Sequence, residues 1–361
     1  MSDEDETNDG AAPGRPDADE PPICGYDGLA CDLDGVVYHG DQAVPGAPEA
    51  LSRMAARGTA VVYVTNNASR LPRDVAASLI SLGAPATAES VVTSAQAGAA
   101  RVRRLVAADR TEAPVVVALG GPGVRAALDA QGCRPVGPEA DEAVAVLQGY
   151  GPELTVQDFA RAARRISDGV LWVATNTDAT LPQPWGNAPG NGAYVGLLQA
   201  VTGRDPIVVG KPEPPLYDLA TERLGAGRAL AIGDRLDTDI DGAAAAGLDA
   251  AWVLTGVHLP SDLMRLQTAL PRYVVAGLAE LELPYAAARA DGDGWVCGEH
   301  TAFIEPEVGA PLRLGGPRPP GIEAVRAGLA ALVAARHTRA VPVEDLVAAA
   351  RQLDDIVTAA R

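Results

Sequence analysis

The feature that most constrains the fold of this chain is a short apolar segment that ends in two acids, Asp32 and Asp34. Residues 29–31 are apolar enough for a buried parallel strand, and Gly35 lets the backbone turn away after the second acid. In open α/β sheets, ligands bind in the crevice outside the carboxyl ends of the strands. Two carboxylates in a partly dry crevice need a cation between them, unless one of them keeps its proton. Taken alone, the stretch also fits an ordinary turn that contains two acids.

Strand and helix patterns alternate from residue 23 onward, which predicts an α/β fold with a doubly wound parallel sheet. The strands of this sheet are expected at residues 29–31, 60–64, 207–209, 228–232, 250–254 and 273–275, and its helices at 47–57, 72–82, 215–224 and 240–246. A second α/β run has strands at 115–119, 143–147 and 170–174 and helices at 94–106, 123–131, 155–166 and about 193–201. We interpret the second run as an insertion into the first.

Composition and pattern divide the chain into four parts. The first 22 residues carry eight acidic residues and one arginine, so we expect a disordered acidic tail. A Rossmann-like core is expected at residues 23–89 and 206–286, with an inserted α/β cap domain at 90–205. Residues 287–361 are expected to form a small α+β C-terminal extension, with a strand at 295–304, a Gly/Pro linker at 312–320 and helices at 322–335 and 343–359.

Charge and cysteine usage exclude several classes of partner. A formal net charge of −18 disfavours nucleic acid, because the phosphates would be repelled. The sequence has no apolar run long enough to cross a bilayer and no basic start followed by an apolar segment, so we expect no membrane partner and a cytoplasmic location. The four cysteines form no CxxC pair and no Cys/His metal spacing, which favours free thiols.

Polar residues also follow other predicted strands. The strand at residues 60–64 runs into Thr65, where a hydroxyl and backbone N–H groups suit a phosphate oxygen. A helix cap before residues 72–82 is an equally good local interpretation. Lys211 is the single lysine of the chain, which suggests a position that requires a compact ammonium with three donors. Residues 181–192, rich in Pro and Gly, are expected to form an ordered surface loop that contacts substrate.

A second acidic cluster, from Asp234 to Asp239, follows the strand predicted at residues 228–232. If the two clusters meet, Asp32 and Asp234 with a backbone carbonyl offer hard oxygen ligands for one Mg²⁺. Asp32 can then attack phosphorus and form an aspartyl phosphate. Asp34 is expected to act first as an acid and then as a base, because a neighbouring carboxylate and partial burial raise its pKa.

The phosphate oxygens need donors around them, since their charge shifts during transfer. The expected substrate-binding residues are Thr65, Asn66, Asn67 and Lys211, together with Asn176 from the predicted cap. Asp239 is expected to orient Lys211 or a water bound to the metal.

Four short motifs occur in a fixed order along the chain. They are Asp-Leu-Asp-Gly-Val at 32–36, Val-Thr-Asn-Asn at 64–67, Gly-Lys-Pro at 210–212 and Gly-Asp-Arg-Leu-Asp-Thr-Asp at 233–239. Together with Ala-Thr-Asn-Thr-Asp at 174–178, this order resembles the subclass IIA phosphatases of the haloacid dehalogenase superfamily over residues 28–281. The resemblance implies Asp32 as the nucleophile, Asp34 as the acid/base, Mg²⁺ bound by Asp32, the Asp34 carbonyl and Asp234, and phosphate bound by Thr65, Asn66 and Lys211.

The resemblance leaves the substrate open, because the core motifs bind phosphate whereas the cap contacts the leaving group. Members of the subclass act on phosphoglycolate, pyridoxal phosphate, nucleotides and nitrophenyl phosphate. The length, the alanine-rich composition and the extension resemble members that hydrolyse glycerol 3-phosphate, and the polar groups of Asn176 and Asp178 suit a small polyol. Glycerol 3-phosphate is therefore the expected substrate. Trp185, acting as an aromatic shelf, would instead favour pyridoxal or a nucleobase.

The extension allows a second interpretation. The resemblance implies that it is acetyltransferase-like, but residues 287–361 contain no acyl-CoA pyrophosphate loop, so acetyl transfer is not expected. A protein-interaction module is the alternative from another functional class. A non-catalytic binding protein would lack the nucleophile or a metal-binding acid, and neither is missing here. A homo-oligomer is compatible with the sequence. His39 and His258 are interpreted as surface or sheet-end residues rather than ligands.

Overall fold

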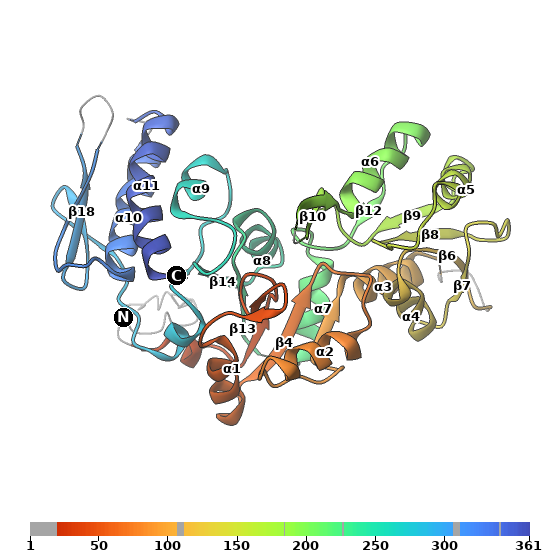
Figure 1. The fold of residues 1–361 in the computed structure, drawn as a ribbon, viewed down its shortest axis with the longest axis horizontal. Helices are drawn as coiled ribbons and strands as arrows, with labels where there is room; N and C mark the ends of the chain where they lie inside the picture. Colours follow the sequence, from red (N-terminus) through yellow and green to blue (C-terminus); the bar gives the residue numbers. More distant parts are fainter. Residues whose placement is uncertain (1–19, 107–111, 184, 226, 306–310, 339–340) are drawn as a thin grey trace, which may run out of the picture.

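A computed structural model describes residues 20–106, 112–183, 185–225, 227–305, 311–338 and 341–361. The acidic tail expected at residues 1–22 lies outside these ranges except for its last three positions. Three larger sheets follow one another across the described part of the molecule, with the first in the middle of Figure 1, the second on the right and the third on the left. None of the helices in the described ranges is long and apolar enough to span a bilayer.

The first sheet has six parallel strands in the order β15-β14-β13-β1-β4-β5. Its strands are β1 (Gly28–Cys31), β4 (Ala60–Thr65), β5 (Val91–Thr93), β13 (Ala229–Gly233), β14 (Asp249–Val253) and β15 (Tyr273–Val275). Successive side chains alternate between the two faces, so Leu29 and Cys31 enter one apolar layer and Ala30 the other. The predicted doubly wound parallel sheet is confirmed.

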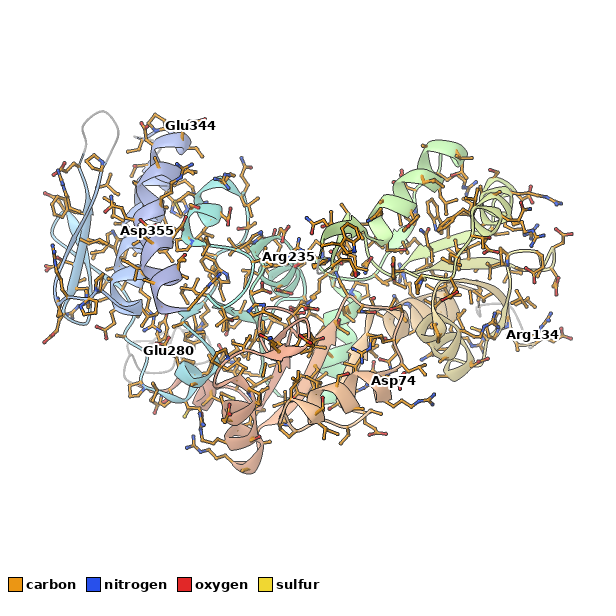
Figure 2. The ribbon with its side chains drawn as sticks, in the orientation of Figure 1. Asp74, Arg134, Arg235, Glu280, Glu344 and Asp355 are labelled. Carbon is orange, nitrogen blue, oxygen red and sulfur yellow. The ribbon has the colours of Figure 1, made fainter. Side chains whose placement is uncertain are left out.

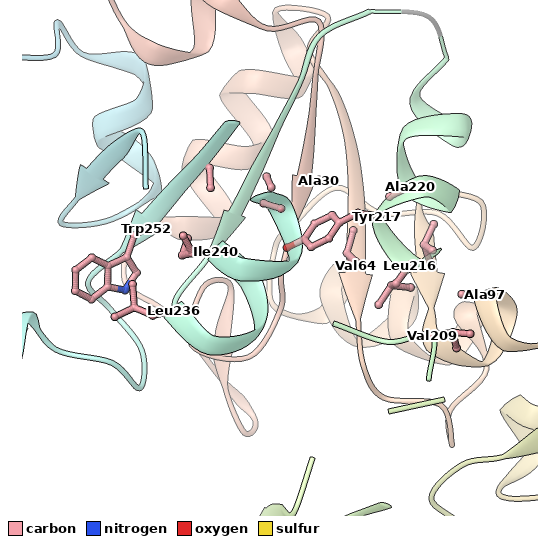
Figure 3. Close-up of a cluster of buried hydrophobic side chains, with 14 of the residues drawn as sticks. Ala30, Val64, Ala97, Val209, Leu216, Tyr217, Ala220, Leu236, Ile240 and Trp252 are labelled. Atoms are coloured by element: carbon pink, nitrogen blue, oxygen red, sulfur yellow. The ribbon is translucent and has the colours of Figure 1, made fainter. Parts of the chain in front are cut away.

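Helices cover both faces of this sheet. One face is covered by α1 (Ala47–Ala56), α2 (Pro72–Ser81) and the 3-10 helix η3 (Leu278–Glu282), and the other by α7 (Pro215–Leu224), the π-helical turn η2 (Leu236–Ile240) and α8 (Asp241–Ala245). Figure 3 shows the second layer, where Tyr217 of α7 and Ile240 of η2 lie against Ala30, Val64 and Trp252 of the strands. The sheet is therefore buried on both faces, and its polar residues gather at its carboxyl edge.

Three further elements complete this part. They are the 3-10 helix η1 (Pro22–Gly25), a small hairpin of β2 (Tyr38–His39) and β3 (Gln42–Ala43), and α9 (Pro260–Arg265). The hairpin and α9 were not predicted, because segments this short carry no measurable periodicity. Both lie next to the carboxyl edge of the first sheet, in the loops that follow β1 and β14.

The second sheet has five parallel strands in the order β12-β9-β8-β6-β7. Its strands are β6 (Val115–Leu119), β7 (Arg134–Val136), β8 (Ala145–Gln148), β9 (Leu171–Ala174) and β12 (Ile207–Val208), and its helices are α3 (Ser94–Val106), α4 (Pro122–Ala130), α5 (Val156–Ser167) and α6 (Asn191–Thr202). The α5 helix begins with a capping box in which Thr155 and Asp158 bond each other's backbone N–H.

Both crossings between the sheets lie a few residues later than predicted. The cap was expected to start at residue 90, but Val91–Thr93 pairs with β4 in the first sheet. The core was expected to resume at residue 206, but Ile207–Val208 pairs with β9 in the second sheet. Each segment is a short apolar strand that fits either sheet by composition, so only the pairing decides its membership.

The prediction of a loop at residues 181–192 is wrong, because most of this segment forms a β-hairpin. β10 (Thr180–Gln183) pairs antiparallel with β11 (Gly186–Pro189), and Gly186 adopts a φ of 134° at the turn. A two-stranded ribbon leaves one side of each strand without a ladder partner, so it tolerates the prolines that argued against a strand. The α6 helix then starts at Asn191.

The C-terminal extension, residues 287–361, also differs from expectation in its strands. The third sheet is antiparallel, in the order β16-β17-β18-β19: β16 (Arg289–Asp291), β17 (Gly294–Cys297), β18 (His300–Ile304) and β19 (Leu312–Gly315). The strand predicted at 295–304 is two strands with a turn at Gly298 (φ 55°), and the predicted linker at 312–320 begins with β19. α10 (Ile322–Thr338) and α11 (Val343–Ala360) follow as predicted.

Candidate active site

The carboxyl edge of the first sheet brings the predicted site residues together. Because β1 and β13 are parallel neighbours, Asp32 and Asp234 leave the sheet side by side, and Thr65 ends the adjacent β4. The backbone N–H of Asp32 donates to the Ile232 carbonyl at 2.9 Å, which continues the ladder past the end of β1. Residues far apart in the chain therefore meet through sheet pairing alone.

Three buried carboxylates form one cluster at this edge. Oxygen atoms of Asp32, Asp234 and Asp239 lie within 4.8 Å of one another, an arrangement that can hold a metal ion. Backbone N–H groups orient two of these acids: Val257 donates to Asp234 Oδ2 at 2.6 Å, and Arg235 donates to Asp239 Oδ2 at 3.0 Å. The Asp34 carboxylate is not a member of this cluster.

Lys211 lies between the carboxylates with a side chain that is 4% exposed. Its Nζ forms ion pairs with Asp32 and with Asp239 Oδ1, the latter at 2.6 Å. Burial alone would lower the pKa of Lys211, but the charges of Asp239 and Asp32 outweigh it and raise the pKa well above its usual range. The ammonium is therefore held in its charged form, as a compact cation with three donors.

The electrostatics of the cluster fit a divalent cation. Burial raises the pKa of Asp32, and it also raises the pKa of Asp234 to about 7, with Asp239 adding to the shift. Three carboxylates face one ammonium, so the ionised cluster carries an uncompensated negative charge. Hard oxygen ligands of this kind suit Mg²⁺. The space beside Asp234 is kept open by Gly256 and Gly35, where a Cβ atom would lie 2.0 and 2.5 Å from Asp234 Oδ2.

The loop after β4 is shaped by its own side chains. Thr65 Oγ1 accepts from the Asn67 N–H at 3.1 Å, and Asn67 Oδ1 accepts from the Ser69 N–H at 2.9 Å. The alternative role as a helix cap is wrong, because the N-cap of α2 is Leu71, with no side-chain cap bond. Among the described residues the Thr65 hydroxyl has no acceptor, so it can donate to a ligand.

Two amides join the edges of the two sheets. Asn66 receives the Lys211 N–H on Oδ1 at 2.8 Å and donates from Nδ2 to Asp178 Oδ2 at 3.1 Å. Asn176 donates from Nδ2 to the Asn66 carbonyl at 2.6 Å, and its buried Oδ1 has no hydrogen-bond partner among the described residues. Asn176 thus lies beside the loop after β4, and its Oδ1 remains as an acceptor for a ligand.

These residues line one cleft of about 460 Å³ between the two sheets. Its walls include Asp32, Asp34, Thr65, Asn67, Asn176, Asp178, Lys211, Asp234 and Asp239, and also Tyr150, Thr180 and Pro182 from the second sheet and its hairpin. Partial burial raises the pKa of Asp34, against the opposing effect of His39. The cleft therefore combines a buried acidic floor with a polar wall on the cap side.

The sequence is similar to one family of hydrolases. A model described as haloacid dehalogenase-like hydrolase matches residues 29–134, and one described as HAD-hydrolase-like matches residues 208–281. The D-glycerol 3-phosphate phosphatase of Mycobacterium tuberculosis is 43% identical over 257 residues, which are 71% of this chain and 71% of that protein. The chain belongs to the haloacid dehalogenase-like hydrolases. The 5'-nucleotidase YutF of Bacillus subtilis is 34% identical over 266 residues, 72% of this chain and 98% of that protein.

Solved structures of this hydrolase family agree with the fold. The glycerol phosphate phosphatase of Mycobacterium tuberculosis in complex with magnesium has a TM-score of 0.72 at 37% identity and covers 86% of this chain and 91% of its own. Its complex with calcium has a TM-score of 0.76 and covers 89% of this chain. The family resemblance, the α/β fold and the classification as a phosphatase are thereby confirmed, and the expected Mg²⁺ agrees with the magnesium complex of this relative.

One residue that lines the cleft of this phosphatase was not predicted, and one predicted aromatic contact lies outside the cleft. Arg235 lines the cleft and forms an ion pair with Asp237 at 2.9 Å. Its positive charge favours the ionised form of Asp178, and Figure 2 places it beside the β10 hairpin. Arg235 belongs to the motif at 233–239, but the sequence does not show that its side chain faces the cleft. Trp185 is 73% exposed at the hairpin turn and does not line the cleft, so it is no shelf for a ring. His39 is also exposed at this edge.

Proposed function

We propose that this haloacid dehalogenase-like phosphatase hydrolyses a small phosphate monoester with Mg²⁺, and that the substrate is glycerol 3-phosphate. The observation that carries the proposal is the buried cluster of Asp32, Asp234 and Asp239 around Lys211, at the carboxyl edge of a parallel sheet. A cluster of this charge at a sheet edge can hold a cation and an anionic ligand together.

The metal would be held by Asp32, Asp234 and the backbone carbonyl of Asp34. A bound Mg²⁺ would offset the negative charge of the floor and polarise a phosphate oxygen. Asp239 would remain on Lys211, as the distance of 2.6 Å supports. Asp234 would be kept in place by the Val257 N–H and by the lack of side chains at Gly256.

Two carboxylates would carry the chemistry. The Asp32 carboxylate attacks phosphorus, a P–O bond to the carboxylate forms, and the ester P–O bond breaks. The leaving alkoxide takes its proton from the Asp34 carboxylic acid, whose pKa is raised by partial burial. Asp34 then accepts a proton from a water that attacks phosphorus of the aspartyl phosphate, so inorganic phosphate leaves and Asp32 is restored.

Donors around the phosphate would complete the site. The Lys211 ammonium favours the ionised form of Asp32 against the effect of burial and can share a phosphate oxygen, while the Thr65 hydroxyl and the Asn66 N–H can donate to the others. On the cap side, the unpartnered Oδ1 of Asn176 is suited to accept from a substrate hydroxyl, and Asn67 lines the same cleft.

The acidic side chains of the cleft favour an uncharged leaving group. Asp34 and Asp178 line the same cleft as the buried cluster, so a carboxylate on the leaving group would meet like charge. Glycerol brings hydroxyls and no charge, and a relative at 43% identity is named for this substrate. Tyr150 is the single Phe, Tyr or Trp among the residues that line the cleft, and His39 adds one imidazole, which disfavours a ring-bearing leaving group.

A substrate panel tests this proposal. Phosphate release from glycerol 3-phosphate, phosphoglycolate, pyridoxal phosphate and nucleoside monophosphates is measured at saturating Mg²⁺, and glycerol 3-phosphate is expected to have the highest kcat/KM. Asp32→Asn is expected to abolish turnover with an unchanged circular dichroism spectrum. Undiminished activity after removal of divalent cations would contradict the metal assignment, and a preference for a nucleotide would contradict the substrate. The cytoplasmic location, the oligomeric state and an interaction role of the extension stay predictions.

A further inference from the structure

The segment that follows β14, residues 254–266, sets the position of Asp234. Its Val257 N–H donates to Asp234 Oδ2 at 2.6 Å, and the Gly256 backbone approaches so closely that a Cβ atom would lie 2.0 Å from this oxygen. Thr255 also donates from Oγ1 to the Gly35 carbonyl at 2.6 Å. Any movement of this segment therefore moves the N–H group that donates to Asp234, the candidate metal ligand.

Side chains of the C-terminal extension hold the same segment on both sides of Val257. Arg361 Nε donates to the Leu254 carbonyl at 2.8 Å, Asp354 Oδ1 accepts from the Ser261 N–H at 2.9 Å, and Arg336 Nη1 donates to the Leu263 carbonyl at 2.6 Å. Figure 1 shows α11 alongside α9, with the end of α11 next to the first sheet. The extension thus contacts the segment through backbone groups, which a side-chain substitution in the segment itself cannot remove.

The start of the segment borders a cavity, whereas Leu263 and Met264 of α9 are buried in the same apolar cluster as Val357 of α11. The cavity, of about 480 Å³, lies between the segment, the β2–β3 hairpin and the two helices of the extension. Thr255 and Gly256 line this cavity, opposite Val325 of α10 and Val357 of α11. Because Thr255 and Gly256 border a cavity, polar contacts with the extension carry more of the restraint near these two residues.

We propose that the C-terminal extension positions the Asp234 carboxylate for the divalent cation, with Arg361 and Asp354 as positioning residues that act through the backbone of residues 254–266. The inference rests on the proposed function, because it takes Asp234 as a metal ligand. It gives the extension a role in the phosphatase reaction without a second active site.

Charge and position have opposite effects at Arg361, which makes the inference testable. Burial lowers the pKa of Arg361 and the Asp234 carboxylate opposes that shift, so the two groups interact. If Arg361 acted only through its positive charge, its removal would strengthen Mg²⁺ binding, since a like charge near the cation would be gone. A positioning role predicts weaker binding.

The experiment compares full-length variants with matched controls on the same helix. Arg361→Met and Asp354→Ala remove the contacts, whereas Arg351→Met and Asp355→Ala change exposed residues for which the described chain shows no polar partner. Mg²⁺ binding is measured by isothermal titration calorimetry below the unfolding temperature, together with the Mg²⁺ concentration that gives half-maximal activity. We expect about fivefold weaker binding for the first pair, the effect of one lost hydrogen bond, and no change for the controls.

Three further readouts separate position from general stability. The KM for substrate at saturating Mg²⁺ should stay unchanged, and hydrogen exchange of the Val257 amide should become faster in the metal-free protein. Asp354→Asn keeps an acceptor for the Ser261 N–H and should bind Mg²⁺ like the wild type. A lower Tm with unchanged Mg²⁺ affinity for Arg361→Met and Asp354→Ala overturns the inference.

Asp234→Asn separates failure of the inference from failure of the proposed function. If this variant loses Mg²⁺ binding while the extension variants bind normally or more tightly, the extension does not position the site and the proposed function stands. If Asp234→Asn binds Mg²⁺ like the wild type, the metal assignment is wrong, and both the proposed function and the inference fall.

Discussion

At the scale of single residues, Lys211 shows how composition and burial combine. It is the only lysine in the sequence, and the structure buries it between Asp32 and Asp239. A buried ion pair adds little net stability, but removal of one partner leaves the other charge uncompensated and is costly. A lysine is therefore needed at this position both to bind phosphate in the proposed reaction and to compensate the two buried carboxylates.

Lys211→Met is expected to lower the free energy of unfolding by about 3–5 kcal/mol, because two buried carboxylates lose their cation. Saturating Mg²⁺ should restore part of this loss, since a cation that binds only the native state stabilises it. Urea unfolding with and without Mg²⁺ measures both effects. Equal stability of the variant and the wild type without Mg²⁺ would show that the carboxylates do not need Lys211.

At the scale of elements, the cleft is built from strand ends of one sheet and the hairpin of the other. The β10–β11 hairpin and the loop before it provide Thr180, Pro182 and Asp178. Burial raises the pKa of Asp178, against the opposing hydrogen bond from Asn66. The charge that this loop presents to the leaving group therefore depends on one side chain.

Asp178→Asn is expected to shift selectivity toward anionic leaving groups. The amide keeps an acceptor for Asn66 Nδ2 but removes the negative charge. The ratio of kcat/KM for phosphoglycolate to that for glycerol 3-phosphate should rise about tenfold, since two charges about 8 Å apart interact by roughly 1–2 kcal/mol at an effective dielectric of about 20. Asp205→Asn, at an exposed position elsewhere in the same part of the chain, is the control. An unchanged ratio would mean that Asp178 does not face the leaving group.

At the scale of the whole molecule, the extension shares a hydrophobic core with the first sheet. Val325 and Leu332 of α10 belong to the same buried cluster as Trp252 of β14. Arg326, 7% exposed, adds a polar link: its Nε donates to the Val274 carbonyl of edge strand β15 at 2.8 Å, and its Nη2 pairs with Glu280 at 3.0 Å. The extension therefore covers the open edge of the first sheet.

Arg326→Met is expected to lower the free energy of unfolding by about 2–4 kcal/mol, because the part-buried Val274 carbonyl loses its donor and the Glu280 carboxylate loses its cation and keeps only the Ala276 N–H. The exposed Arg351→Met on α11 should change stability by less than about 0.5 kcal/mol. Urea unfolding monitored by tryptophan fluorescence compares the two. If both variants unfold like the wild type, the contact between extension and sheet contributes no stability.

How well each strand was predicted depended on the residue pattern of its own segment. The strands at Val115–Leu119 and Tyr273–Val275 were predicted to the residue, because each is a continuous apolar run with clear boundaries. The β10–β11 hairpin and β19 were missed, because proline and glycine hid strands whose partners lie at an edge. Short strands such as Ile207–Val208 were found but placed in the wrong sheet, since pairing is a long-range choice.

The sequence by itself determined which chemical groups stand at the ends of which strands, because the order of apolar runs and the turns after them are local properties. Asp32, Thr65, Lys211 and Asp234 were all identified in this way. Only the tertiary structure decided that Asp239 joins the carboxylate cluster and that backbone groups of a distant segment hold Asp234. The reason is that distances between segments depend on strand order and on packing. In addition, nearly every residue has a backbone N–H, so the sequence does not show which of them donates to a side chain.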